Sequence, residues 1–519
     1  MKKAILLAAA CAGSFVLAQT PADTPLAQAV ADSKAFTPAA AKLDQLAKRL
    51  PLLAQLPAKT SFCVSFQDAQ TYGLSVEAIA VSITDDMEAV TKLLSAATRG
   101  GAGTEASGSA QKPLHLAPIY AVASLKPGSE TAILQNIESD INEACQSMPE
   151  HCKAVTYKDW KGVSFDVGAA LSEEPVPFLQ ALVPFVKGLK LQVIYRLEGH
   201  LLQYCICEKF SDMAWPSSAS ESLLTHRDLP VLLPAGKETP TCVLLADRKL
   251  LASVSRAANA GLTDVAPSSD IVTAIVAGMA DKLLDSLSGR DLSLAVTPAG
   301  QSYIVRAAFG LKGVRFTPGE LSIPKVAARR DMLVSIASTG LKTENSGSLD
   351  DLTAIFRTTQ KGLTMAMRIK TDDAAQVVQM LTQDPTVDPG KGFLCQLPEM
   401  PPLQGKLNGK VLTLSTGKKM AAAIDERQCV KVPFCGVAFA VKPSALPQQE
   451  GMEMDLPLPI AGDLKTGCIT GTLSDDQGTL ILDLRISPAA AKVGKGSAKG
   501  GAAKSKASRP AAVKTSSAS

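Results

Sequence analysis

The spacing of apolar residues divides the chain into helical and extended segments. From Leu43 to Leu56, leucines recur every three or four residues. This spacing predicts an amphipathic helix, which Pro51 must break or kink. The following "TSFCVSF" (60–66) alternates bulky and small side chains, as a strand does. Helical spacing returns over 85–97 and predicts a second helix there.

Strand–turn–helix units recur further along the chain. "PIYAVASLKPGSETAILQNIESDINEA" (118–144) and "LTMAMRIKTDDAAQVVQMLTQ" (363–383) both predict a strand, a polar turn and a helix. "ADRKLLASVSRAANAG" (246–261) and "LNGKVLTLSTGKKMAAAI" (407–424) both predict a turn, a strand and an Ala-rich helix. In the second of these, Asn408-Gly409 is a strong hairpin signal.

These recurrences, with "TSFCVSFQDA" and "DMLVSIASTG" as matching first strands, predict a degenerate internal duplication. The spacing is unequal, so the first copy would carry an insertion. That insertion would include "YKDWKGVSFDV" (157–167) and the hairpin "LQVIYRLEGHLLQYCICEKF" (191–210). The alternative is that α+β domains reuse strand–turn–helix units by chance.

Two later segments also predict hairpins: "GRDLSLAVTPAGQSYIVRAAFGL" (289–311) and "GCITGTLSDDQGTLILDLRI" (467–486), the latter turning at 475–478. With hairpins mixed among helices, the predicted fold class is α+β, with antiparallel sheets backed on one face by helices. The predicted divisions are a signal peptide (1–18), a Pro/Ala-rich linker (19–41), two degenerate repeated modules (42–265 and 266–486, joined near 262–270) and a disordered basic tail (487–519).

The strand opening with "LPAKTSFCVSF", the strand–helix units and the late "GKVLTLSTGKKMAAAI" together resemble uncharacterised exported bacterial proteins built from repeated α+β modules. The resemblance is diffuse and rests on no invariant motif. It implies an exported module and brings no catalytic residues with it.

The first residues predict export. Met1-Lys2-Lys3 is basic, residues 4–15 are apolar, and Val16-Leu17-Ala18 fits a cleavage site before Gln19. The apolar run falls short of the roughly 20 residues of a transmembrane helix. Lipidation at Cys11 is disfavoured because no leucine stands three positions before it. We therefore expect a periplasmic, extracellular or cell-envelope protein without a transmembrane segment in the mature chain.

Charge is distributed unevenly along the chain. The formal net charge is +4, but the last 33 residues hold seven basic and no acidic side chains, which leaves the body mildly acidic. Lys/Ala/Gly/Ser composition cannot bury a core, so the tail is predicted to be disordered. Either the tail only solubilises the chain or it binds polyanions; the candidate residues are Lys492, Lys495, Lys499, Lys504, Lys506, Arg509 and Lys514. Export and the absence of aromatic residues argue against nucleic acid.

Cysteines are the remaining candidate chemistry. Ten of the eleven follow the signal peptide. The candidates for disulfides or free thiols are Cys63, Cys145, Cys152, Cys205, Cys207, Cys429 and Cys435. In "LLQYCICEKF", the i, i+2 spacing places two thiols on one strand face about 6 to 7 Å apart, so a mutual disulfide is disfavoured. Free thiols, a cross-strand disulfide, and metal or redox work remain as alternatives. The alternation predicts that the strand cysteines lie on the smaller, more polar sheet face.

No motif predicts catalysis. The four histidines form no metal-binding pair, no G-x-S-x-G elbow is present, and adjacent acids such as Asp372-Asp373 fall at predicted helix starts and turns. We expect no cofactor and no metal. The predicted function is a non-enzymatic binding or interaction scaffold at the cell envelope, with an unknown protein or an anionic envelope component as its partner. The alternative is an exported hydrolase with an unrecognised active site.

Overall fold

A computed structural model of the chain describes residues 24–39, 42–72, 76–83, 115–173, 183–235, 238–252, 286–287, 290–324, 332–343, 348–359, 362–382, 388, 390–396, 401–441 and 463–489. The chain divides into two compact units, Met1–Ala489 and Ala490–Ser519. The predicted signal peptide, the helix over 85–97, the module junction near 262–270 and the seven tail cations lie outside the described residues.

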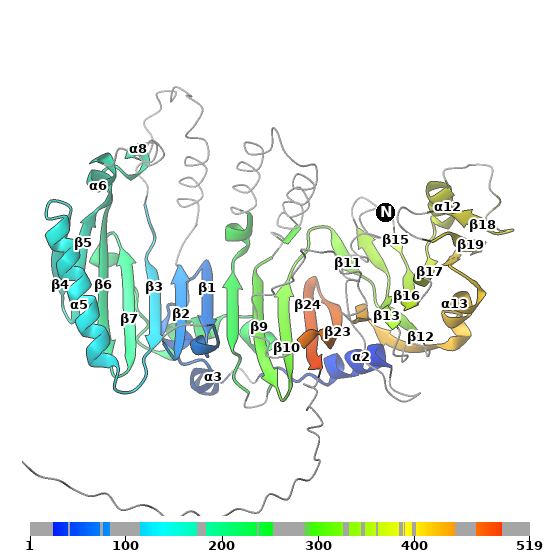
Figure 1. Ribbon diagram of the computed structural model, residues 1–519, viewed down its shortest axis with the longest axis horizontal. Helices are drawn as coiled ribbons and strands as arrows, with labels where there is room; N and C mark the ends of the chain where they lie inside the picture. The colour runs from blue at the N-terminus through cyan, green and yellow to red at the C-terminus, as the bar shows by residue number, and fades with distance from the viewer. Residues whose placement is uncertain are drawn as a thin grey trace, which may run out of the picture. The chain divides into compact units, whose positions relative to one another are not determined.

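One antiparallel sheet of nineteen strands dominates the first unit (Figure 1). From one edge, its strands are β4 (Cys152–Tyr157), β5 (Trp160–Asp166), β6 (Lys190–Glu198), β7 (Leu201–Cys207), β3 (Ile119–Ser124), β2 (Ala78–Ile83), β1 (Phe62–Phe66), β8 (Cys242–Ala246), β9 (Leu292–Ala299) and β10 (Ser302–Phe309). The sheet continues through β24 (Thr479–Ala489), β23 (Asp463–Asp476), β22 (Gly436–Val441), β13 (Met332–Ser338), β16 (Asp351–Thr359), β17 (Gly362–Lys370), β20 (Val411–Ser415), β19 (Leu403–Asn408) and β18 (Phe393–Cys395). The predicted α+β class with antiparallel strands is confirmed, and most of the strands belong to this one large sheet.

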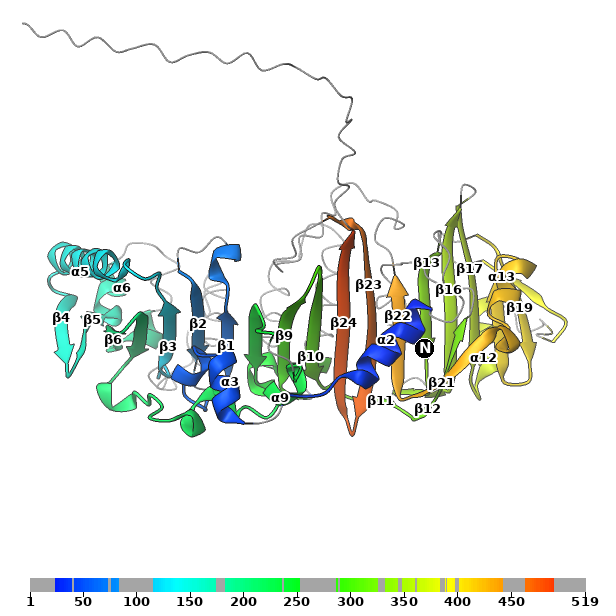
Figure 2. The same ribbon diagram turned by 90° about the horizontal axis from the view of Figure 1, so that it is seen from below.

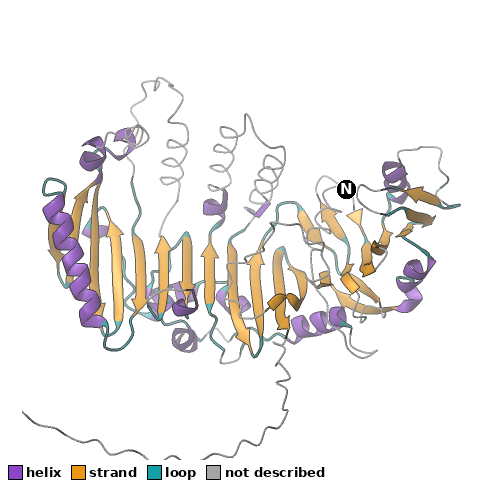
Figure 3. Cartoon of the chain, viewed as in Figure 1, coloured by secondary structure: helices purple, strands orange, loops and turns teal. Residues whose placement is uncertain are grey.

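The other strands are short, and the longest described helix has 18 residues. Two small sheets contain β11 (Val314–Phe316), β14 (Leu341–Thr343) and β15 (Ser348–Leu349), and β12 (Gly319–Pro324) with β21 (Cys429–Phe434). The described α-helices are α2 (Pro25–Ala35), α3 (Leu43–Arg49), α5 (Glu130–Ser147), α6 (Val167–Glu173), α8 (Val183–Val186), α9 (Leu229–Leu232), α12 (Ala374–Thr382) and α13 (Lys418–Ala423). The 3-10 turns are η1 (Leu53–Gln55), η2 (Ala69–Tyr72), η3 (Phe210–Asp212), η4 (Ala219–Glu221), η5 (Leu223–Thr225) and η6 (Glu426–Gln428). Figure 3 shows how small the helical share of the described chain is.

Local sequence signals placed many elements well. The leucine-rich segment is helical to Arg49 and resumes as η1 after Pro51, as the break predicted. The unit from 118 forms β3 and α5, and the unit from 363 forms β17 and α12. Both late hairpins are present. Two segments differ from prediction: α2 lies inside the expected linker, and residues 248–252 are helical where a strand was expected.

The helix at 248–252 has a local cause. The carboxylate of Asp247 accepts a hydrogen bond from the Leu250 N–H at 2.7 Å, as a helix N-cap does. A capping aspartate thus outweighs the weak hairpin signal of Asp247-Arg248.

The order of strands recurs across the sheet. In the first half (the strands from β1 to β10), the order is β6-β7-β3-β2-β1-β8-β9-β10. In the second half (the large-sheet strands from β13 to β24), the order β19-β20-β17-β16-β13-β22-β23-β24 repeats the same connections. The hairpin over 191–210 therefore occupies the place of β19–β20 and is not part of an insertion. The described part of segment 246–261, residues 246–252, follows the end of β8 as a helix, whereas 407–424 contains β20, so the two segments do not match as predicted.

Equivalent hairpins also agree in detail. "LEGHLLQYCIC" (197–207) and "LNGKVLTLSTG" (407–417) align without gaps, and both turn glycines have positive φ, +63° at Gly199 and +59° at Gly409. A matching hydrogen bond joins each hairpin turn to the neighbouring strand. Leu125, which follows β3, donates its N–H to the His200 carbonyl at 2.9 Å, and Thr371, which follows β17, donates its N–H to the Lys410 carbonyl at 3.0 Å.

The two halves meet where β10 pairs with β24. Arg306 lies opposite Asp483 at this seam. Each residue is the fourth after the first paired residue of its hairpin, Ser302 or Thr479, so the two occupy equivalent positions. The seam is therefore a local two-fold arrangement centred on this pair. The Arg306 guanidinium donates a hydrogen bond to the Asp483 carboxylate, and both side chains are largely buried.

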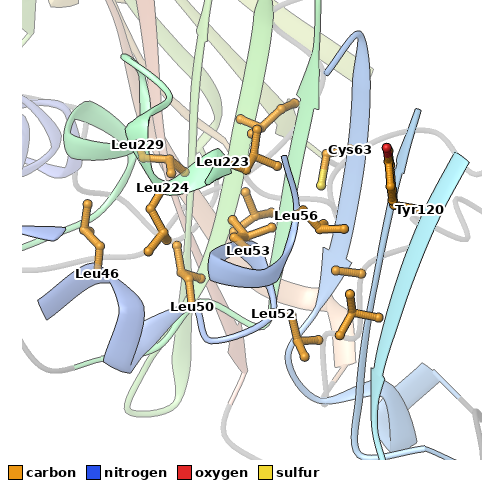
Figure 4. Packing of buried hydrophobic residues seen from close by; sticks show 14 of the residues in the cluster. Leu46, Leu50, Leu52, Leu53, Leu56, Cys63, Tyr120, Leu223, Leu224 and Leu229 are labelled. Atoms are coloured by element: carbon orange, nitrogen blue, oxygen red, sulfur yellow. The ribbon is translucent and has the colours of Figure 1, made fainter. Parts of the chain in front are cut away.

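Helices pack on both faces of the sheet, and not on one face as predicted. The helices α5 and α12 lie on one face, and further helices and turns cover the opposite face, which carries the small residues. The helices α3, α9 and α2 follow one another along the sheet (Figure 2). Leu26 and Val30 of α2 pack against Ala337, Ala438 and other residues of the second half. Over the first half, leucines of α3, η1, η5 and α9 pack against Cys63 and Tyr120 (Figure 4). The bulky leucines need small sheet residues beneath them to reach close packing.

This cover corrects the predicted environment of the strand cysteines. Cys63 and Cys205 have no exposed surface, and Cys207 is 1% exposed. All three belong to the main hydrophobic core of the first half. The small-residue face is therefore the buried face, and not a more polar secondary one.

Candidate functional site: a cationic cleft in the second half

The candidate site is a cleft of about 1080 Å³ at the β18 end of the sheet. Its floor consists of side chains from one face of the paired strands β17, β20 and β19. Thr413 at the centre pairs with Arg368 on one side and with Lys406 on the other. Because alternate residues share a face, Ser415 and Gln404 extend this polar floor.

The same alternation makes the opposite face apolar. Leu412 and Leu414 point away from the cleft and pack with Val377 and Val378 of α12. This packing anchors the three strands from behind. The polar side chains on the cleft face are therefore carried by a supported sheet and not by a free loop.

The walls come from the segments that flank these strands. On one side, Met420 of α13 and the following Ile424 pack onto Ala366, which fixes α13 on the cleft face. On the other side, Leu394 of β18 lines the cleft and is 71% exposed. An apolar side chain this exposed beside a polar floor gives the cleft a mixed surface.

Positive charge predominates in the cleft. Five cations and two acids line it, a formal net charge of +3. The cations are Arg368, Lys391, Lys406, Lys418 and Arg427. Within the described part of the chain, Lys406 and Lys418 have no carboxylate at ion-pairing distance, whereas Lys391 lies 3.5 Å from Asp388. The two unpaired lysines are the groups most available to an anion.

The two acids of the cleft are already engaged by cations. Glu426 lies 2.5 Å from Lys431, whose hydrogen bond lowers the pKa of this carboxyl. Asp425 accepts hydrogen bonds from Arg427, which likewise lower its pKa. Both carboxyl groups therefore stay ionised. Glu426 mainly neutralises Lys431, and Asp425 mainly neutralises Arg427.

Arg368 is the buried cation of the floor. Its guanidinium donates a hydrogen bond to Asp351 at 3.0 Å and lies 3.8 Å from Glu426. Burial raises the pKa of the Asp351 carboxyl, and the charge of Arg368 opposes that shift. The Asp351 carboxylate therefore holds the Arg368 guanidinium in position at the cleft floor.

The corresponding face of the first half is closed by aromatic side chains. Arg196 occupies the place of Lys406, and its guanidinium lies 4.8 Å from the Trp160 ring centre. Trp160 stacks on Trp215 at 5.3 Å, and Trp215 meets Tyr120 edge to face at 5.0 Å. Gln203, in the place of Thr413, is fully buried and accepts a hydrogen bond from Arg196. One half therefore fills this face with its own side chains, while the other leaves it open.

A second cavity of about 440 Å³ is lined by Arg227, Arg248, Arg290 and Asp291. Its charges are largely matched internally. Arg227 lies 2.6 Å from Asp291, and Arg290 lies 3.0 Å from the buried Asp228. The larger cleft is therefore the better candidate for an added anion.

The predicted cysteine candidates do not converge on one site. Among the nine cysteines whose side chains the structure describes, none is joined to another in a disulfide. Cys145 and Cys152 approach each other, with their sulfurs 3.5 Å apart. Cys429 and Cys435 instead contact the backbone carbonyls of Ile424 and Phe316. Which cysteines form disulfides in the cell stays a prediction.

Other candidate chemistry can be placed only for the described residues. His115 and His151 each lie beside a glutamate, at 3.0 and 2.9 Å. Asp372-Asp373 precedes α12, as the helix-start interpretation predicted. Among the described residues, no cluster of three or more His, Cys, Asp or Glu side chains could hold a metal ion. Their helices include none with the length and apolarity needed to cross a membrane.

Comparison with known proteins gives no relative: no protein family, curated protein or solved structure matches this chain.

Sequence reasoning did not find the cleft. Its signal was present in β20, where Thr413 separates Leu412 and Leu414 and so marks one polar and one apolar face. The hairpin signal at Asn408-Gly409 places β19 beside this strand, but the sequence did not show that β17 flanks it on the other side. Their polar faces therefore join its own.

Proposed function

We propose that the protein is an exported, non-enzymatic binding scaffold of the cell envelope, built from a duplicated α+β module, whose cationic cleft binds an anionic envelope component. The observation that carries this proposal is the difference between the halves. Trp160 and Trp215 fill this sheet face in the first half. In the second half the same face is open and carries Lys406 and Lys418, which have no carboxylate partner among the described residues. A cavity lined by unpaired cations favours a ligand that supplies the missing negative charge.

The basic tail adds a second, non-specific attraction in this proposal. Its seven cations would raise the local concentration of the protein at an anionic surface, and salt would weaken the effect. The cleft, by contrast, combines charge with the polar floor around Thr413 and the exposed Leu394, and so supplies specificity.

The test separates cleft from tail. Retention on a native envelope fraction is measured at low and at physiological salt. Four proteins are compared: the full chain, a chain ending at Ala489, and each of these two chains carrying K406Q/K418Q. The truncation must follow Ala489 because β24 continues to that residue, beyond the predicted boundary at 486. We expect the double substitution to weaken retention of the tail-less chain about 10- to 30-fold, at about 1 kcal/mol per lysine.

The matched control is K126Q/K153Q, which removes two exposed lysines of the first half and the same total charge. Equal losses in both double variants would show that only net charge matters and would contradict a cleft site. No retention of the unsubstituted full chain under either salt condition would contradict the envelope function itself. Release of a reaction product from the envelope fraction would instead favour the hydrolase alternative.

A further inference from the structure

Cys145 and Cys152 are placed for a covalent bond. Cys145 lies in the last turn of α5, and Cys152 is the first residue of β4. Their sulfurs are 3.5 Å apart, close to van der Waals contact. A disulfide requires about 2.05 Å, so the two side chains need only a small movement.

The backbone between the two cysteines is held by hydrogen bonds. Met148 donates its N–H to the Ala144 carbonyl at 3.0 Å, and Cys152 donates to the Met148 carbonyl at 2.8 Å. His151 accepts from the Asp166 N–H at 2.9 Å, which ties the turn to β5. The short distance between the sulfurs is therefore maintained by the fold around them.

Cys205 and Cys207, the two cysteines of β7, are less well placed for a disulfide than Cys145 and Cys152. Both residues lie on one strand, which places their Cα atoms near the upper limit for a disulfide, and both are buried beneath the leucine layer. Cys145 is only partly buried, and its partner Cys152 begins the edge strand β4. We propose that Cys145 and Cys152 form a disulfide in the exported protein.

The oxidation is a thiol–disulfide exchange. The Cys145 thiol loses its proton and attacks one sulfur of a disulfide-bearing oxidoreductase of an oxidising compartment, releasing the other sulfur of that enzyme as a thiolate. The Cys152 thiolate then attacks Cys145 in the mixed disulfide and displaces the enzyme. Two thiols of this chain are oxidised, one disulfide of the oxidant is reduced to a dithiol, and two protons are transferred.

The bond would secure the end of the sheet. Within the described chain, β4 pairs only with β5. The helix α5 packs through Ile133, Ile137 and Ile141 against residues of β3, β6 and β7. A disulfide joins the edge strand to this packed helix and so opposes fraying of the edge.

Peptide mapping tests the bond. The full chain is recovered from the exported fraction of its cells, quenched with N-ethylmaleimide in denaturant, and digested with trypsin and a glutamate-specific protease without reductant. Cleavage after Glu150 separates the two cysteines. We expect Ala144–Glu150 to remain joined to His151–Lys153, and the two to separate only after reduction. Both fragments carrying the maleimide before reduction would overturn the proposal.

Hydrogen exchange tests the role of the bond. Amide exchange along β4 is compared in the oxidised protein, in the reduced protein and in C145S. We expect about tenfold slower exchange in the oxidised protein than in the other two. C395S serves as the control, because Cys395 lies in β18 of the other half and its loss leaves the bond intact. Equal exchange in all samples would overturn the stabilising role.

Discussion

The ion pair at the seam should contribute strongly to stability, and Arg306→Met tests this. The side chain of Arg306 is 5% exposed and that of Asp483 is 15% exposed. Removing the arginine leaves a carboxylate withdrawn from water. The neighbouring Arg485 offers little compensation because it lies 2.6 Å from Asp32. Breaking a buried pair in this way costs about 3–5 kcal/mol, and we expect a value near the lower end, about 3 kcal/mol.

Urea unfolding measures the effect with two probes. Far-ultraviolet circular dichroism follows the whole sheet, and the fluorescence of Trp160 and Trp215 follows the first half alone. The control is Arg427→Met, which removes an 88% exposed arginine paired with Asp425 and should cost less than about 1 kcal/mol. The double variant R306M/D483L removes both charges and should recover most of the stability lost in R306M.

The pH dependence gives the sign of the effect. Burial raises the pKa of Asp483, and Arg306 opposes that shift. Without Arg306 the pKa rises further. A carboxyl whose folded pKa exceeds its unfolded value stabilises the fold while protonated and loses that contribution as pH rises through the folded pKa. The deficit of R306M should therefore be smaller near about pH 4.5 than near about pH 8. A variant within about 0.5 kcal/mol of the parent at both pH values would refute the reasoning.

Three further substitutions test single contacts. Gly436→Ala should lower the free energy of unfolding by at least about 2 kcal/mol in urea titration, because φ is +142° and a Cβ would lie 1.9 Å from the Leu473 carbonyl oxygen; an unchanged midpoint would contradict this. Tyr120→Phe should cost about 1–2 kcal/mol by the same assay, because the Ala214 N–H loses its acceptor at 2.8 Å; a neutral effect would mean that this N–H finds another partner. Burial raises the pKa of Cys429 to about 11, so its contribution to stability is present below its unfolded pKa of about 8.5 and is lost as pH rises through about 11. Calorimetry should therefore show a smaller alkaline loss of Tm in Cys429→Ala, and parallel losses in both proteins would contradict the shift.

Local signals explain which parts of the fold were predictable. Gly199 and Gly409 occupy the positive-φ positions of tight hairpins, and such turns need only adjacent residues. The order of strands depends on contacts between distant segments, such as β10 with β24, and no local pattern encodes them. The recurrence of strand–helix units was visible in the sequence. Which unit of the first half corresponds to which unit of the second half became clear only from the order of strands in the sheet.

The misassigned sheet face has a similar cause. Alternation at Cys63 and Cys205 shows that small residues share a face, but not whether that face is covered. Residues 43–56 and 223–232 supply the leucines that cover it, and they come from separate parts of the chain. The candidate cleft was not predicted for the same reason, since Arg368 becomes a neighbour of Thr413 only through the pairing of β17 with β20.

The local two-fold arrangement at the seam restricts how this chain can associate. If two identical halves met through the same strand, the central position would face its own copy, so Arg306 would oppose an arginine or Asp483 an aspartate. Either contact would bury like charges, at a cost of several kcal/mol. Because both halves belong to one polypeptide, position 306 and its equivalent, position 483, can carry different residues. The first half therefore pairs more favourably with the second half than with a copy of itself. The Arg306–Asp483 pair therefore favours pairing of the first half with the second half over pairing of either half with a copy of itself. This preference opposes association of two chains through these strands.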